Sequence, residues 1–481
     1  MGRPRWLLIA LACFCALALW PIWAQPVAAL SDWPNHLARV HVLAHYASST
    51  AYQAYYEPAW GPYPNLGFDL LGVPLAKLLP VELVGQLFLS LVVLSWVAGV
   101  YLLGCAIEGK ATLRVLIASA FVYGESFLLG YANYAFGMAL SMAALGLAFG
   151  ARPLSRGRRL SVAVIALAAS ISHAAACVTL VLGAFGFLTG RALSARRRGE
   201  PWLARDTIER GLLFVPAGVF FATWLLFVAD RTRDRAFSGV RTSARLLFGS
   251  LLPTYSENAD AVVLLWLLLA VFAAPADFAG SYEANGRYVL GAWTFALFTF
   301  RLKPVARARP LWRLLGMMAV TALVARQVIV GVELSRLSQQ MSAQAALLDS
   351  LPPEARHLGG ATFLESNPPR AQRLRERALL HAVSLAVIRR EADVPMLYAI
   401  PGVQPLRHRQ QRWNGHRISK SHPGALDVAR MKADLDAVLL CRAPAAVREA
   451  ALDGGRSVGV VNDCELFEWT GQPRIERGTP P

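Results

Sequence analysis

The chain has 481 residues, of which 55% are hydrophobic and 16% are charged, and its formal net charge is +17. Soluble domains usually carry about 25% charged residues, so this composition excludes an ordinary soluble protein. Residues 1–332 hold 28 basic and 15 acidic residues, whereas residues 333–481 hold 20 and 16. The basic residues of the first part lie in short clusters between apolar runs, such as 152–159 and 196–198. This distribution is typical of cytoplasmic loops and excludes a nucleic-acid-binding surface.

The first apolar run, residues 6–24, predicts an uncleaved transmembrane helix with its N-terminus inside. The alternative is a signal peptide cleaved after Val27-Ala28-Ala29. We favour the helix because the apolar regions of signal peptides are shorter, about 7–15 residues. A polar, aromatic-rich outer loop at 31–65 follows and ends in a Pro/Gly cluster, which is typical of loops.

The remaining apolar runs predict an all-α polytopic membrane bundle of about nine to eleven membrane segments. Residues 66–80 are apolar but interrupted, which indicates a re-entrant or interfacial segment. Residues 160–190 lie between two arginine clusters, and two short helices meeting near Ser172-His173 would keep both clusters inside. The other spans are predicted at 81–107, 113–131, 134–150, 211–229, 259–275, 288–300 and 314–332.

After the transmembrane domain, residues 1–332, the chain predicts a small soluble α/β domain at 333–481. Basic residues between 301 and 313 indicate an inside loop, which places this domain outside the cytoplasm if one more crossing lies within 241–258. Strands are expected at Ala361–Leu364, Met396–Ile400, Ala437–Cys441 and Val458–Val461, and helices at 371–391 and 443–452.

Cys441 and Cys464 are the only cysteines of the soluble domain, and either a disulfide or two unpaired core thiols fits the sequence. No phosphate-binding glycine motif occurs at a strand-to-helix turn, and no CxxC pair or combined cysteine and histidine metal motif occurs. His41 and His45 have the spacing of a zinc site but no evident third ligand. We therefore assign the soluble domain no cofactor and name no metal ligands, and the sequence leaves a dependence on a divalent metal open.

The first outer loop contains the strongest candidate site. In a helix beginning near Trp33, Asp32, His36 and Arg39 occupy positions i, i+4 and i+7 and share one face. A carboxylate, an imidazole and a guanidinium so placed can deprotonate a hydroxyl and bind a phosphate. The alternative is that Asp32 serves as the N-cap, because Pro34 lies within the first turn.

Other candidates lie near the membrane surface. Asp69 and Glu125 interrupt apolar stretches and are candidates for lining a cavity, although Glu125 could equally be solvated at an outer helix end. His173 is either a cavity-lining donor or a polar residue at the interface. Arg287, followed by Tyr288, opens a span and either binds a lipid phosphate or extends to the interface.

The pattern resembles the GT-C class of membrane glycosyltransferases, and within it the protein-mannosyltransferase and aminoarabinose-transferase branch and its bacterial relatives. The resemblance covers the architecture of nearly the whole chain. Its motifs are Asp32-Trp33-Pro34-Asn35-His36, Gly130-Tyr131-Ala132-Asn133-Tyr134, Ser172-His173 and Gly286-Arg287-Tyr288. The branch often has two adjacent acidic residues in the first outer loop, whereas here Trp33 follows Asp32.

The resemblance implies inverting transfer of a sugar from a polyprenyl-phosphate donor to an extracytoplasmic acceptor by a multi-pass enzyme of the bacterial-type inner (plasma) membrane. Asp32 would be the base, His36 would orient it, and Arg39 or Arg287 would stabilise the departing lipid phosphate. Asp69, Glu125, His173 and Tyr288 would contribute to the substrate site. The alternatives are a transporter or lipid flippase that uses Glu125 and Asp69 for passage, and a GT-C-like scaffold without activity.

Overall fold

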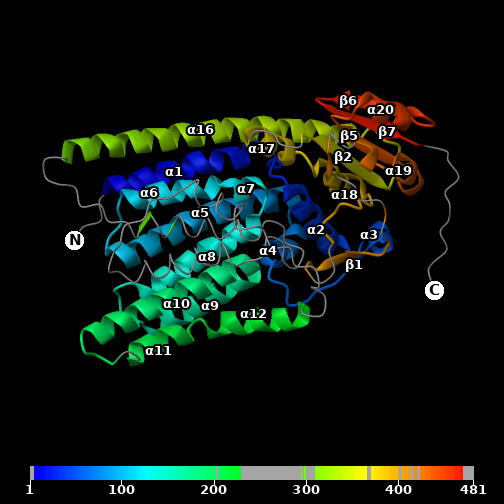
Figure 1. Cartoon of the computed structure of the whole chain (residues 1–481). Coiled ribbons are helices and arrows are strands. Elements are labelled where there is room, and N and C mark those ends of the chain that lie inside the picture. The colour runs from blue at the N-terminus through cyan, green and yellow to red at the C-terminus, as the bar shows by residue number, and fades with distance from the viewer. Residues whose placement is uncertain are drawn as a thin grey trace.

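The computed structural model in Figure 1 describes residues 5–228 except 202 and 203, positions 294, 297 and 298, and residues 309–469 except 366–369, 400–402, 411, 413–416 and 420–422. The span predicted at 259–275, and all but three positions of that at 288–300, lie outside the described residues. So do two predicted site residues, Arg287 and Tyr288.

The described part of the chain is a multi-pass helical membrane bundle with a small sheet domain at one end (Figure 1). Five of the described helices are long and apolar enough to cross a membrane. They are α1 (Arg5–Trp23), α5 (Val81–Glu108), α8 (Ala132–Phe149), α10 (Ala174–Arg197) and α16 (Arg309–Leu348). A sixth span is formed if α11 (Arg205–Leu212) and α12 (Val215–Val228), which are bent by 44°, cross as one.

The sequence of α5 explains how the bundle packs. Its buried face includes Val84, Phe88 and Val92, while Leu87 and Leu91 on other faces are 42% and 40% exposed, as expected for side chains that meet lipid. A Cβ at Gly99 would lie 2.3 Å from the Ala139 carbonyl oxygen, so this glycine lets α5 and α8 approach closely.

One predicted span is broken, and two other predicted segments are present as a short helix and as a pair of helices. The stretch predicted as one span at 113–131 is broken into α6 (Leu113–Ser119), the 3-10 turn η1 (Ala120–Tyr123) and α7 (Glu125–Leu128), because Gly124 has an extended backbone. Residues 66–80 contain the short helix α4 (Gly67–Ala76). The two helices predicted within 160–190 are present as α9 (Arg156–Ser172) and α10, which meet at His173.

The helix α16 connects the two parts of the molecule. It contains the predicted span 314–332 and continues without a break to Leu348, so the boundary expected between residues 332 and 333 falls inside it. Figure 1 shows it running from the N-terminal end of the bundle to the sheet.

The sheet domain contains a five-stranded sheet with the order β4-β2-β5-β7-β6. Strands β4, β2 and β5 are parallel, and β7 and β6 continue the sheet antiparallel. Their bounds are β2 (Leu358–Leu364), β4 (Arg417–Ser419), β5 (Ala437–Cys441), β6 (Arg456–Val461) and β7 (Cys464–Glu468). The helical segments are α17 (Arg370–Ala378), η4 (Ala382–Ser384), α18 (Leu385–Arg390), η5 (Pro423–Ala425), α19 (Val428–Asp434) and α20 (Ala445–Leu452).

The predictions for this domain were partly wrong. Residues 396–399 form a turn and bends and not a strand, and the buried side chains of Met396 and Leu397 pack in a hydrophobic cluster with residues of α2, α18, β2 and β5. The helix predicted at 371–391 is split into α17, η4 and α18. The strands predicted at Ala361–Leu364, Ala437–Cys441 and Val458–Val461 lie within or coincide with β2, β5 and β6.

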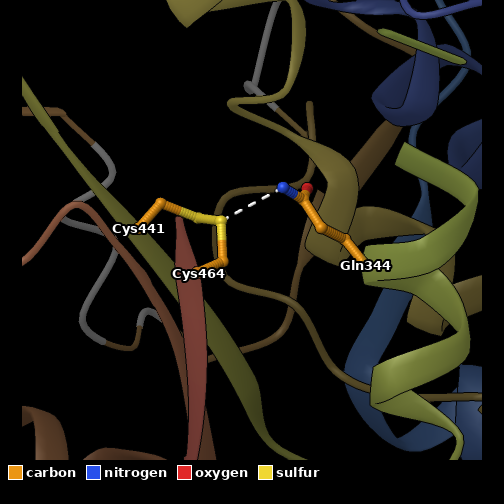
Figure 2. Close-up of a disulfide and its surroundings, with 3 residues drawn as sticks. All are labelled: Gln344, Cys441 and Cys464. Carbon is orange, nitrogen blue, oxygen red and sulfur yellow. Dashed lines mark hydrogen bonds between the residues drawn. A yellow bond between two sulfur atoms is a disulfide. The ribbon is translucent and has the colours of Figure 1, made fainter. Parts of the chain in front are cut away.

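A disulfide joins Cys441 and Cys464, which face each other on the neighbouring strands β5 and β7 (Figure 2). Gln344 of α16 donates a hydrogen bond from its Nε2 to the Cys464 sulfur at 3.1 Å. The disulfide therefore lies where the sheet packs against the end of α16.

The first outer loop is built into the sheet domain. Its elements are α2 (Trp33–His45), α3 (Thr50–Tyr55) and β1 (Tyr56–Pro58), and β1 pairs antiparallel with β3 (Leu406–His408). Tyr52 and Tyr56 are fully buried in one hydrophobic cluster with residues of β2, α18 and β5. The Tyr56 hydroxyl donates to the Ala392 carbonyl at 3.3 Å and accepts from the Val394 amide at 3.1 Å.

Candidate functional site

The Asp32 carboxylate does not cap its helix. Asp32 occupies the N-cap position of α2 with Pro34 in the first turn, as the sequence suggests, but its side chain makes no capping hydrogen bond and its backbone is already helical. The residue is 7% exposed. Its amide donates to the Leu129 carbonyl at 3.1 Å, so the turn after α7 holds the start of α2.

Gly130 makes this close contact between α2 and α7 possible. Its φ is +85°, a conformation that side chains rarely adopt, and a Cβ there would lie 2.6 Å from the Asp32 backbone nitrogen. Because backbone atoms cannot yield as a flexible side chain does, any larger residue would displace Asp32.

A buried ion pair links α2 to α4. Arg39 donates from Nε and Nη2 to the two carboxylate oxygens of Asp69, both at 2.7 Å, and both side chains are fully buried. Asn133 at the start of α8 fixes the same end of α4, since its Oδ1 accepts from the Phe68 amide at 2.7 Å and its Nδ2 donates to the Asn65 carbonyl at 2.8 Å. Asp69 thus reaches Arg39 from a helix whose start is held in place.

His36 is neutral in this arrangement. Arg39 Nη2 lies 3.1 Å from His36 Nδ1, and because a guanidinium can only donate, Nδ1 accepts and the ring proton is on Nε2. Burial, together with the nearby Arg39 charge, holds the pKa of His36 well below its usual range. The ring is therefore an uncharged hydrogen-bonding group at pH 7.

The sheet domain contributes side chains to the same cluster. His381 Nε2 lies 3.7 Å from Asp32 Oδ1, and the His381 side chain is 1% exposed. Ser384 Oγ donates to Asn35 Oδ1 at 2.6 Å. The Tyr398 ring contacts both His36 and His381, with ring centroids 6.1 and 5.4 Å apart. The cluster therefore combines residues from the start and the end of the chain.

The structure brings four of the predicted site residues together: Asp32, His36, Arg39 and Asp69. Glu125 begins α7, four residues before Leu129, whose carbonyl accepts from the Asp32 amide. His173 caps α10 by accepting from the Ala175 amide at 3.1 Å, and its ring packs edge-on against Tyr134. The predicted roles of Arg287 and Tyr288 concern residues outside the described part of the chain.

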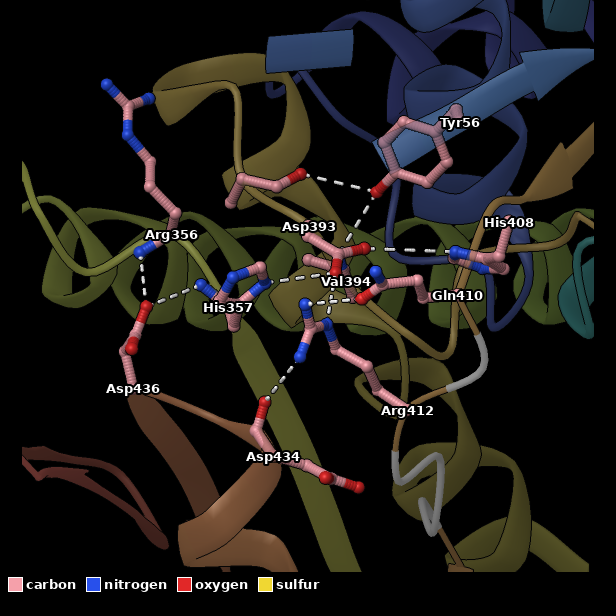
Figure 3. Close-up of polar contacts among 11 residues, drawn as sticks. Tyr56, Arg356, His357, Asp393, Val394, His408, Gln410, Arg412, Asp434 and Asp436 are labelled. Carbon is pink, nitrogen blue, oxygen red and sulfur yellow. Dashed lines mark hydrogen bonds and ion pairs between the residues drawn. The ribbon is translucent and has the colours of Figure 1, made fainter. Parts of the chain in front are cut away.

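A second polar cluster surrounds Asp393 where β1 and β3 join the domain (Figure 3). The Asp393 carboxylate lies 3.0 Å from His357 Nδ1, 2.9 Å from Arg412 Nε and 3.8 Å from His408 Nδ1. Burial lowers the pKa of His408, and the Asp393 charge opposes that effect. This cluster fixes the loop to the domain and does not include the predicted site residues.

Within the described ranges, no group of three His, Cys, Asp or Glu side chains is placed to hold a metal.

Sequence reasoning missed Asn35, His381, Ser384 and Tyr398. Asn35 had a detectable signal, since it lies at i+3 from Asp32 on the same helix face. The other three are about 350 residues away in sequence, and no local pattern marks them.

No family model and no curated protein matches the chain. Among solved structures, the arabinofuranosyltransferase AftD from Mycobacteria is similar with a TM-score of 0.43 and 15% identity. The likeness covers 98% of this chain and 40% of the length of AftD.

Proposed function

We propose that this chain is a membrane glycosyltransferase that moves a sugar from a polyprenyl-phosphate donor to an acceptor hydroxyl with inversion at the anomeric carbon. The observation that carries the proposal is the Asp32 carboxylate, which is buried where α2 meets the sheet domain and is not used as a helix cap. Its three nearest neighbours along that face, Asn35, His36 and Arg39, are also buried polar groups.

In this mechanism Asp32 accepts the proton of the attacking hydroxyl as that oxygen bonds to the anomeric carbon and the lipid phosphate departs. His36 and His381 orient the acceptor and the carboxylate. A positioned base contributes roughly 10²–10⁴ in rate. The Arg39 charge is already neutralised by Asp69, so Arg287 is the better candidate to stabilise the departing phosphate.

We further propose that the N-terminus lies inside and that the sheet domain lies outside the cytoplasm. Figure 1 places α11, which follows the arginine cluster 196–198, at the N-terminal end of the bundle, and the sheet at the opposite end. Basic clusters favour the cytoplasmic side, which supports this orientation. The disulfide between Cys441 and Cys464 supports it independently, because disulfides persist in oxidising compartments.

The test compares the parent with Asp32→Asn in proteoliposomes supplied with a panel of radiolabelled undecaprenyl-phosphate sugars and envelope acceptors. We expect the variant to transfer sugar roughly 10²–10⁴ times more slowly. Glu57→Gln is the matched control, since Glu57 is a carboxylate of the same loop that pairs with Arg407 at the surface, and it should transfer at the parent rate.

An Asp32→Asn variant that transfers at the parent rate would refute the mechanism. A parent that transfers nothing from any donor would instead support an inactive scaffold. Uptake of a substrate without a covalent product would support the transporter. The pairing of Asp69 with Arg39 does not favour that alternative, because the Asp69 charge is already neutralised.

A further inference from the structure

Two buried hydrogen-bond donors on α2 have no acceptor among the described residues. They are Nδ2 of Asn35 and Nη1 of Arg39, and both residues are 0% exposed. A buried donor without a partner destabilises a folded protein, so each such group requires an explanation. Two of them one helical turn apart on the same helix indicate a site for a ligand atom.

The surrounding contacts hold both donors in place. Ser384 Oγ donates to Asn35 Oδ1 at 2.6 Å, so the amide is fixed with its NH₂ group directed away from Ser384. Asp69 binds Nε and Nη2 of Arg39, which leaves Nη1 as the remaining nitrogen. The orientation of Asn35 is therefore set by the sheet domain, and that of Arg39 by α4.

The position and charge of these donors restrict the ligand. Asp32, Asn35 and Arg39 lie at i, i+3 and i+7 and share one face of α2. The two donor residues and their direct hydrogen-bond partners carry no net charge, because Asp69 neutralises Arg39 and both Asn35 and Ser384 are neutral. A pair of donors whose charge is balanced by Asp69, on the helix face that also carries Asp32, suits a neutral oxygen that accepts from the donors and gives its proton to the carboxylate.

We propose that Asn35 Nδ2 and Arg39 Nη1 bind the oxygen of a hydroxyl group on an acceptor that is itself a glycoside. This inference rests on the proposed glycosyl transfer and names the residues that position its nucleophile. The hydroxyl proton passes to Asp32, the oxygen bonds to the anomeric carbon, and the bond from that carbon to the phosphate oxygen breaks with its electron pair leaving on the lipid phosphate. Ser384 acts as a positioning residue through Asn35.

The test uses the double variant Asn35→Leu/Ser384→Ala, which removes both partners of one hydrogen bond and leaves no new unpaired group. Affinity for a panel of methyl glycosides of common hexoses and pentoses is measured by ligand-observed NMR. Retention of undecaprenyl phosphate is measured by native mass spectrometry. Gln53→Leu, a substitution of an exposed amide in the same outer loop, is the control and should leave both affinities unchanged.

We expect the variant to bind the tightest methyl glycoside at least about 10-fold more weakly and to retain undecaprenyl phosphate within about twofold, since the lost donors face a neutral oxygen. Unchanged glycoside affinity, or a parent that binds none of the glycosides, would overturn the inference. If the variant instead retained undecaprenyl phosphate 10-fold more weakly, the donors would be assigned to the phosphate. That result would also overturn the inference.

Thermal unfolding provides a measurement that needs no ligand. Because the Asn35 donor is unpaired, the double variant should melt at or above the parent Tm, and a fall of more than about 5 °C would assign Asn35 a structural role instead. A failure of the proposed function can be distinguished from a failure of this inference. If Asp32→Asn transfers sugar normally while the double variant loses glycoside affinity, the hydroxyl site stands without the transfer reaction.

Discussion

The buried ion pair between Arg39 and Asp69 allows a quantitative prediction. Asp69→Asn preserves the shape of the side chain but removes its charge, which leaves the guanidinium without its counter-charge where both side chains are 0% exposed. Removing one partner of a buried pair costs about 3–5 kcal/mol, because the remaining charge cannot be solvated. The two 2.7 Å contacts make this pair bidentate, so we expect a destabilisation within that range.

The assay is thermal unfolding of the detergent-purified protein, followed by tryptophan fluorescence. The double variant Arg39→Met/Asp69→Leu leaves no buried charge and should lose less stability than Asp69→Asn alone. Arg205→Met is the control, because Arg205 is 93% exposed and its pair with Glu209 should contribute only about 0–1 kcal/mol. The reasoning is refuted if Asp69→Asn melts like this control or if the double variant is the least stable.

Three further predictions concern the same loop and domain. Gly130→Ala should displace Asp32 and abolish transfer or folding, whereas Gly157→Ala, where an added Cβ meets nothing within 4 Å, should leave activity and Tm close to the parent values. Burial and the nearby His45 lower the pKa of His41 from 6.5 to about 4, so the unfolded chain binds more protons between these values. Stability should therefore fall by up to about 3 kcal/mol as the pH drops from 6.5 to 4, and melting curves of His41→Phe should lack this component. The disulfide has a sequence separation of 23, so Cys441→Ser/Cys464→Ser should cost about 3 kcal/mol, and a reductant should lower the Tm of the parent but not of the variant.

The local part of the site could be predicted from sequence because a helix has a fixed repeat. Asp32, His36 and Arg39 are on one helix, and the 3.1 Å contact between His36 and Arg39 follows from their spacing. The turn at His173 was predictable for a different reason, since charge on both sides of 160–190 required the chain to reverse. Both predictions depend on residues close together in sequence.

The partners of these residues could not be predicted. Arg39 binds Asp69, which is 30 residues away, and Asn35 binds Ser384, which is 349 residues away. Periodicity and charge patterns describe the segment in which they occur and contain no information on which distant segment packs against it. The break at Gly124 was not predicted, although it is local. The apolar pattern of 113–131 fits a straight span, and hydropathy does not report the extended backbone of a glycine.

The first outer loop and the sheet domain form a single folding unit, which explains why a boundary at residue 333 separates parts that depend on each other. Tyr52 and Tyr56 supply buried side chains to the domain core, and Arg407 and Glu57 pair across β1 and β3. In addition, α2 packs directly against η4, where Ser384 Oγ donates to Asn35 Oδ1. A domain that failed to dock would therefore leave Asp32 without His381 and the Asn35 amide without a fixed orientation. Formation of the site is thus coupled to folding of the domain, even though the residues that would bind substrate lie almost entirely in the loop.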